Sequence, residues 1–132
     1  MSFLLDSDTC SAHLKARAGV LHRFVQHSGR LYIPTIVLGD LHTWAHRQED
    51  PRKRLEAIAA LLEDVEVLVF DARCAEVFGV TRGGLLRLGI SVPSVDLMIA
   101  SVALAHDLTL VTHNTADFAN VPGLRLEDWL AP

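Results

Sequence analysis

Cysteine is scarce in this chain, and the two present, Cys10 and Cys74, are far apart and form no C-x-x-C pair. That spacing argues against a zinc ribbon or a disulfide scaffold and favours free thiols. The chain also lacks a long hydrophobic run. Half of its residues are hydrophobic, but charges interrupt the apolar segments well short of the about 20 residues that cross a bilayer. We therefore expect a soluble protein with no membrane partner.

Targeting and repeat signals are missing as well. The N-terminal residues 1–6 carry no basic region, and no extended apolar segment precedes a small-residue cleavage site. We therefore expect a cytoplasmic protein without a signal peptide. The sequence shows no internal repeat, linker or low-complexity tract. Its 132 residues are predicted to form a single domain, 1–132, with a hydrophobic core of its own.

Basic residues are not in excess. Twelve Lys and Arg stand against sixteen Asp and Glu, which gives a formal net charge of −4. This is the wrong sign for a protein that holds nucleic acid by bulk electrostatics alone. A phosphate-bearing substrate would therefore need a metal ion or a local basic patch on this protein.

Short apolar segments alternate with stretches of helical periodicity. Strands are predicted at 3–6, 31–33, 65–70 and 108–112, with a short fifth strand at 124–126. Helices are predicted at 9–15, 20–27, 36–47, 51–62, 71–88 and 94–106. Parallel neighbouring strands need helical crossovers, so this alternation predicts an α/β fold with a mostly parallel sheet covered on both faces.

Proline, serine and glycine mark several helix boundaries. Pro51 suits a first helical turn, and Ser94 after Pro93 is a predicted N-cap. Gly89 and Gly123 are predicted at helix or loop ends.

Four aspartates are embedded in apolar sequence near the predicted ends of strands or starts of helices: Asp6, Asp40, Asp96 and Asp117. An isolated carboxylate is costly to bury, so such acids imply a compensating cation or a dense hydrogen-bond network. Active sites of parallel sheets gather at the carboxyl ends of the strands, where we expect the four acids to converge. Mg²⁺ or Mn²⁺ is the cation that an all-oxygen cluster favours.

Three of these acids also have an ordinary structural interpretation. Asp6 can cap the following helix, and Asp96 can complement the positive end of a central, largely apolar helix. Asp117 can organise an Asx-type turn near Asn114. A shared site explains all of the acids together, whereas these interpretations explain them one at a time.

Four stretches of the sequence carry these acids: Leu4-Leu5-Asp6-Ser7-Asp8-Thr9, Asp40-Leu41, Asp96-Leu97-Met98-Ile99-Ala100-Ser101 and residues 110–124. Together they resemble the PIN-domain family, and in particular the VapC-type ribonuclease toxins of bacterial toxin–antitoxin (VapBC) pairs. The likeness spans essentially the whole chain, and its C-terminal part through Trp129 is the most specific. It implies a three-layer α/β/α PIN-like domain.

The resemblance also implies a function and its residues. It implies a Mg²⁺- or Mn²⁺-dependent endoribonuclease, a homodimer, restrained by a small VapB-like antitoxin whose C-terminal segment lies over the acidic pocket. The four family acids match Asp6, Asp40, Asp96 and Asp117, and just outside the metal ligands lie Asp8, Thr112 and Asn114. The family usually has glutamate at the second acidic position, where this chain has Asp40.

Contacts with RNA and with partner proteins follow from the same interpretation. Arg82 and Arg87 are candidates for binding the RNA phosphates that flank the cleaved bond, or are solvated helix-end charges. Apolar helical faces are candidates for protein contacts, or ordinary core positions: Val37, Leu41 and Trp44, and Ile58, Leu61 and Leu62.

Two rival motifs and one non-enzymatic alternative remain. The stretch Asp6-Ser7-Asp8-Thr9 also resembles the opening motif of haloacid-dehalogenase-type phosphatases, but the expected lysine and late acidic pair are not evident. His42 and His46 have the spacing of a zinc-binding pair, but the glutamate of H-E-x-x-H is not there. A PIN-like protein with weakened metal ligation at Asp40 would only bind RNA or an antitoxin.

Overall fold

The computed structural model describes residues 1–131. In this part of the chain five strands form one sheet in the order β3-β2-β1-β4-β5, and every neighbouring pair is parallel. The strands are β1 (Phe3–Leu5), β2 (Leu31–Pro34), β3 (Glu66–Leu68), β4 (Thr109–Val111) and β5 (Leu126–Glu127). The predicted parallel sheet is confirmed.

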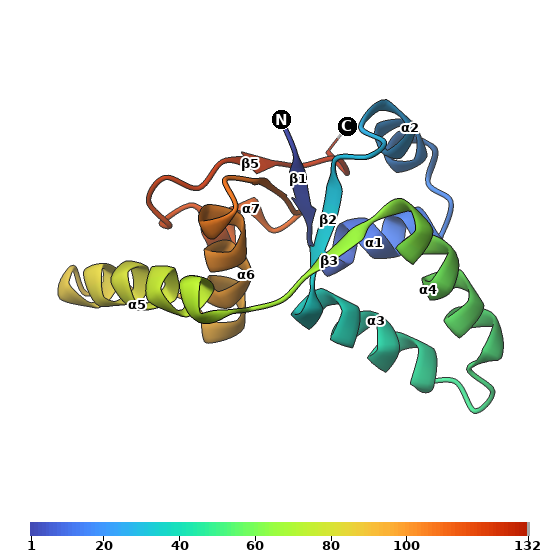
Figure 1. Ribbon diagram of the computed structural model, residues 1–132, viewed down its shortest axis with the longest axis horizontal. Helices are drawn as coiled ribbons and strands as arrows, with labels where there is room; N and C mark the ends of the chain where they lie inside the picture. The colour runs from blue at the N-terminus through green and yellow to red at the C-terminus, as the bar shows by residue number, and fades with distance from the viewer. Residues whose placement is uncertain (132) are drawn as a thin grey trace.

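Seven helices accompany the sheet within the described residues. They are α1 (Ser7–Leu14), α2 (Ala18–Gln26), α3 (Thr35–His46), α4 (Arg52–Asp64), α5 (Ala72–Arg87), α6 (Ser94–Ala105) and α7 (Thr115–Phe118). The helices α1 to α4 pack together on one side of the sheet, and α5 to α7 pack on the other (Figure 1). The fold is therefore the expected three-layer α/β/α arrangement.

Several predicted boundaries are shifted or wrong. The fifth strand occupies Leu126–Glu127 rather than 124–126, and the short helix α7 was not predicted. Pro93 rather than Ser94 is the N-cap of α6, and Ser94 is its first helical residue. Pro51 likewise lies one position before α4, as its N-cap. In both places proline, whose φ is already restricted, introduces the helix.

Two glycine predictions are confirmed by the backbone. Gly89, after α5, and Gly123, before β5, have φ of 74° and 76°. These values lie in the left-handed region that glycine adopts without the steric penalty of a Cβ atom.

The core surrounds the central strands. Every residue of β1 and β4 is buried, because helices cover both faces of the sheet. Helix α6 is buried around most of its circumference, as its apolar sequence predicts. Cys10 and Cys74 are buried free thiols. Among the described residues, no helix is both long enough and apolar enough to cross a membrane.

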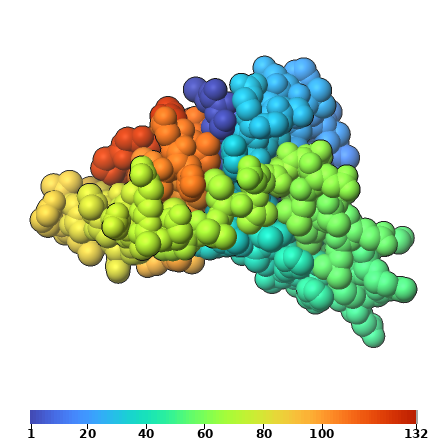
Figure 2. Space-filling view, in the orientation of Figure 1, coloured from blue at the N-terminus to red at the C-terminus, as the bar shows by residue number. Residues whose placement is uncertain are grey.

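The parallel topology defines one functional edge. Helices α1, α3 and α7 follow β1, β2 and β4, so the segments that start these helices share the carboxyl edge of the sheet. Figure 1 shows α3 leaving this edge on one side, and the connection after β3 leading to α5 on the other side. In Figure 2, α5 and the connection between α3 and α4 form two projections on opposite sides of the molecule.

A first prediction concerns Leu4, which is fully buried in the central strand β1. Leu4→Ala should lower the free energy of unfolding by about 2–5 kcal/mol, because it removes buried methyl groups and leaves a cavity. Val25→Ala is the control, since that side chain is 79% exposed. Chemical denaturation measures both. Equal, small effects of the two substitutions would contradict the placement of Leu4 in the core.

Candidate functional site

Asp6 connects the two central strands to the first helix. It directly follows β1, and its backbone N–H donates to the carbonyl of Val111 at the end of β4 (2.9 Å). Its side chain caps α1, with Oδ1 accepting from the backbone N–H of Ser7 (2.8 Å). The capping interpretation of Asp6 is therefore correct, and it leaves the second carboxylate oxygen available for another partner.

That second oxygen is held by Thr112, a buried residue just after β4. The Thr112 hydroxyl donates to Asp6 Oδ2 (2.9 Å) and accepts from the backbone N–H of Asn114 (3.1 Å). One hydroxyl thus fixes both the Asp6 carboxylate and the turn that leads to α7. Asn114 itself is exposed and precedes that helix.

Asp8, in the first turn of α1, also holds the segment between β4 and α7. Its Oδ1 accepts from the backbone N–H of Thr9 (2.7 Å), and its Oδ2 accepts from the backbone N–H of His113 (2.9 Å). The bond to His113 joins the first turn of α1 to the segment after β4. Thr112 thus holds the Asp6 carboxylate, and Asp8 holds the loop that follows Thr112. The role of these two residues around a metal site stays a prediction.

Asp96 and Asp117 extend the acidic edge. Asp96 lies half-buried in the first turn of α6, and Asp117 lies exposed in α7, which packs against α6. Burial raises the pKa of the Asp96 carboxyl, and the nearby charge of Asp117 raises it further. The two acids are close enough to interact electrostatically.

The pKa of Asp6 is also raised, and two of the causes are the charges of neighbouring aspartates. Burial is the main cause, hydrogen bonds from Ser7 and Thr112 oppose it, and the charges of Asp8 and Asp96 add to it. A chain of electrostatic interactions therefore runs from Asp6 to Asp96 and on to Asp117. Carboxylates with raised pKa values in one place are typical of functional sites.

The position of Asp40 relative to the other three acids follows only from the order of the strands and helices. It lies in the second turn of α3, the helix that follows β2, and its side chain is exposed. The sheet topology brings the start of α3 to the same edge as Asp6. The convergence of Asp40 with the other three acids stays a prediction.

The acidic edge has the donor chemistry that a hard divalent cation needs. Within residues 1–131, no three His, Cys, Asp or Glu side chains form a ready-made metal cage. Mg²⁺ does not require one, because it usually keeps several waters and binds through one or two carboxylates together with substrate phosphate. Burial is the largest cause of the raised pKa of Asp6 and of Asp96, and no lysine or arginine is among the groups that shift either pKa. The residues present therefore fit such an ion.

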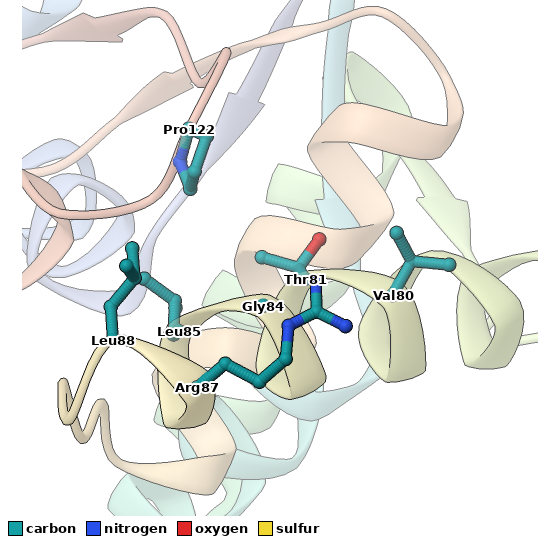
Figure 3. A pocket seen from close by; sticks show the side chains of 7 residues that line it. All are labelled: Val80, Thr81, Gly84, Leu85, Arg87, Leu88 and Pro122. Carbon is teal, nitrogen blue, oxygen red and sulfur yellow. The ribbon is translucent and has the colours of Figure 1, made fainter.

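The two arginines predicted to contact RNA both lie on α5. The Arg82 guanidinium lies over the Phe78 ring, 5.8 Å from its centroid. Arg87 borders an apolar pocket of about 470 Å³, and Figure 3 shows its side chain running back along α5 toward Gly84. Contact of either arginine with RNA stays a prediction.

The apolar faces named as candidate protein contacts belong mainly to the core. Val37, Leu41, Ile58 and Leu61 are buried, so the interpretation of these four as docking residues is wrong. Trp44 and Leu62 are partly buried and pack against the same core. Large exposed apolar side chains lie elsewhere, among them Val25, Val69, Val80, Leu86, Leu88 and Val95.

Sequence reasoning missed one pair beside the site. His113 Nδ1 lies 3.0 Å from the Asp128 carboxylate, which links the loop after β4 to the C-terminal segment. Burial is the largest single influence on the pKa of Asp128 and raises it, but hydrogen bonds from the Leu130 backbone and from His113, together with the charge of His113, outweigh burial and lower this pKa. No local motif signals this contact, because the two residues are fifteen positions apart and α7 and β5 lie between them.

Several known proteins are similar to this chain in sequence and in fold. Residues 3–124 match the PIN domain. The chain is 35% identical over 130 residues to the tRNA(fMet)-specific endonuclease VapC of Shigella flexneri, covering 98% of each protein. Its structure is similar to a chain in each of two solved VapBC complexes. One is DNA-bound VapBC from Salmonella typhimurium, with a TM-score of 0.90, 33% identity and 98% coverage of each chain. The other is VapBC2 from Rickettsia felis bound to a promoter fragment, with a TM-score of 0.88, 27% identity and 98% and 99% coverage.

A second prediction follows from the raised pKa of Asp96. Because folding raises this pKa, the ionised Asp96 carboxylate destabilises the folded state when the pH is above the pKa in the folded chain. This loss of stability disappears as the pH falls below the pKa in the unfolded chain. In metal-free buffer, Asp96→Asn should therefore raise the melting temperature at about pH 7 and have little effect at about pH 3.5. Thermal unfolding across this range measures the difference. A gain that is equal at both pH values would contradict the electrostatic cause.

Proposed function

The chain belongs to the PIN-domain family, and from this membership we propose that it is a metal-dependent endoribonuclease toxin of a VapBC-type toxin–antitoxin pair. The observation that carries the proposal is the electrostatic chain from Asp6 through Asp96 to Asp117 at the carboxyl edge of the sheet. The full-length similarity to a relative named as a tRNA endonuclease supports the reaction class. It favours this function over the haloacid-dehalogenase alternative.

The acidic residues would hold Mg²⁺ or Mn²⁺, with Asp6, Asp96 and Asp117 as the direct ligands and Asp40 beside them. When bound, such an ion lowers the pKa of an attacking water and neutralises charge on the phosphoryl oxygens. It also explains how a protein with a net charge of −4 binds a polyanion, because the cation inverts the local charge.

The surrounding side chains fix the ligands in place. Thr112 holds one Asp6 oxygen and Ser7 holds the other, so the carboxylate cannot rotate freely. Asp8 anchors the His113 backbone, and the Thr112 hydroxyl anchors that of Asn114. This network keeps the Asp6 carboxylate oriented before RNA arrives, which is the positioning that phosphoryl transfer requires.

Initiator transfer RNA is the first substrate to test, because the Shigella flexneri relative is named for tRNA(fMet). Sequence-selective recognition of RNA mostly uses single-stranded loops, whose bases are unstacked and accessible. We therefore propose cleavage in a loop, with Arg82 and Arg87 as candidate contacts to the flanking phosphates.

The proposed partner is a VapB-like antitoxin, since the similar solved structures are VapBC complexes. Its C-terminal segment would lie over the acidic edge and block access of RNA. We also propose that the toxin acts in the cytoplasm as a homodimer.

A binding protein without catalysis is the second candidate. The exposed position of Asp40 and its side chain, shorter than the usual glutamate, favour weaker metal ligation. Such a protein would bind RNA or antitoxin without cleaving RNA. A cleavage assay on the folded, antitoxin-free chain separates the two functions.

A third prediction tests the reaction. The purified chain should cleave initiator tRNA with Mg²⁺ or Mn²⁺ and lose cleavage in EDTA. Asp96→Asn should lower the rate by at least about 100-fold, because loss of a ligand should cost no less than loss of a residue that orients one.

Asp107→Asn is the matched control for this assay. Asp107 precedes β4 at the opposite edge of the sheet and pairs with Arg125. Its φ is 54°, a conformation that asparagine tolerates well, so this variant should fold and keep full activity. An Asp96→Asn protein that is folded and fully active would refute the site. A wild-type protein that binds RNA without cleaving it would favour the second candidate.

A fourth prediction concerns Asp40. Aspartate reaches about 1.5 Å less far than glutamate, by one C–C bond, and Mg²⁺ tolerates little distortion of its short bonds. We expect Asp40 to act on the metal through a bridging water. Asp40→Glu should therefore keep or increase Mn²⁺ affinity and cleavage, whereas Asp40→Ala should lose most of both.

Calorimetric titration with Mn²⁺ and the tRNA assay measure these two effects. The exposure of Asp40 means that a longer side chain meets little steric opposition on α3. If Asp40→Glu is folded but inactive, the site is built around the shorter acid, and the role given to Asp40 is wrong.

A further inference from the structure

Two histidines on α3 stand apart from the other five in the chain. His42 and His46 are the only histidines that are separated by four positions. Both are exposed, and their rings lie almost parallel, with 6.4 Å between centroids and 19° between planes. Other histidines are engaged elsewhere: His13 and His27 stack on aromatic rings, and His113 pairs with Asp128.

Helical geometry explains why these two rings are neighbours. Residues four positions apart lie on the same face of a helix, one turn above the other. A metal ion binds imidazole nitrogen at about 2.0–2.1 Å, so the two rings must approach one another from their present separation. Because both side chains are exposed, rotation about their side-chain bonds can bring this about without disturbing packed neighbours.

We propose that His42 and His46 form a surface chelate for a transition-metal ion of the Zn²⁺, Ni²⁺ or Cu²⁺ class. Neutral imidazole suits these ions, whereas Mg²⁺ prefers oxygen ligands. The site is therefore chemically distinct from the carboxylates at the sheet edge, and it does not depend on the proposed ribonuclease function. Two protein ligands leave the remaining coordination positions to water, so binding is exchangeable.

The local structure makes this a structural site rather than a hydrolytic one. Thr43 occupies the place that glutamate has in H-E-x-x-H, and its hydroxyl donates to the carbonyl of Gly39 (3.0 Å). The position directly after His42 therefore has no carboxylate that could act as a general base. The chelate instead links two successive turns at the C-terminal end of α3.

Metal binding at this pair should stabilise the folded chain. The two imidazoles are held on one face only when α3 is helical, so an ion that binds them both favours the folded state by mass action. Helix α3 also contains Gly39 in its interior, and glycine lowers helix stability relative to alanine. A metal ion that links two turns should therefore stabilise α3. The same helix contains Asp40.

Thermal unfolding of the full chain with Ni²⁺ as the probe tests the proposal, with Mg²⁺ present throughout to compete for the carboxylates. At about ten times its dissociation constant, Ni²⁺ should raise the melting temperature of the wild-type chain by about 3–5 °C. His42→Gln and His46→Gln should each abolish most of the shift. Both side chains are exposed, so both variants should fold.

Two control variants make the result specific. His22→Gln removes a single exposed histidine from α2 and should keep the full shift. Asp96→Asn, in the acidic site, should keep it too. No Ni²⁺-dependent shift in the wild-type chain would overturn the proposal, as would a shift that survives in His46→Gln. Loss of the shift in Asp96→Asn would also overturn it, because the ion would then be bound at the carboxylates.

Discussion

The buried carboxylate of Asp6 is the interaction on which the site depends. The backbone N–H of Asp6 donates to Val111 at the end of β4. Its carboxylate accepts hydrogen bonds from Ser7 at the start of α1 and from Thr112 just after β4. These bonds offset only part of the cost of burial, because the pKa of Asp6 remains raised. The fold thus holds an incompletely compensated negative charge at the carboxyl edge of its sheet, and a cation at this edge would relieve it.

In this arrangement the core supports the site, and the carboxyl edge of the sheet supplies its polar side chains. The central strands are buried on both faces and supply a rigid support. The helices that begin at their carboxyl ends supply the polar groups, as in other parallel sheets. The acids come from elements far apart in sequence, so a site of this kind requires the whole sheet to be in register.

Much of the fold was predictable from the sequence because apolar strands and helical periodicity are local signals. The central helix α6 and the buried strand β4 are clear examples. The errors fall where local signals are weak. Helix α7 has only four residues, β5 has two, and Pro93 occupies the N-cap position that the sequence predicts for Ser94. Contacts between distant residues, such as His113 with Asp128, had no local signal at all.

The sequence by itself determined the identity of the acids and the alternation of strands and helices, since both are set by residue type and spacing. Tertiary structure alone decided that Thr112 holds Asp6, that Asp96 interacts with both Asp6 and Asp117, and that Asp40 lies exposed on α3. It also decided that Val37, Leu41, Ile58 and Leu61 are core residues. The physical reason is that burial and electrostatic interaction depend on the distances between segments, which residue order does not encode locally.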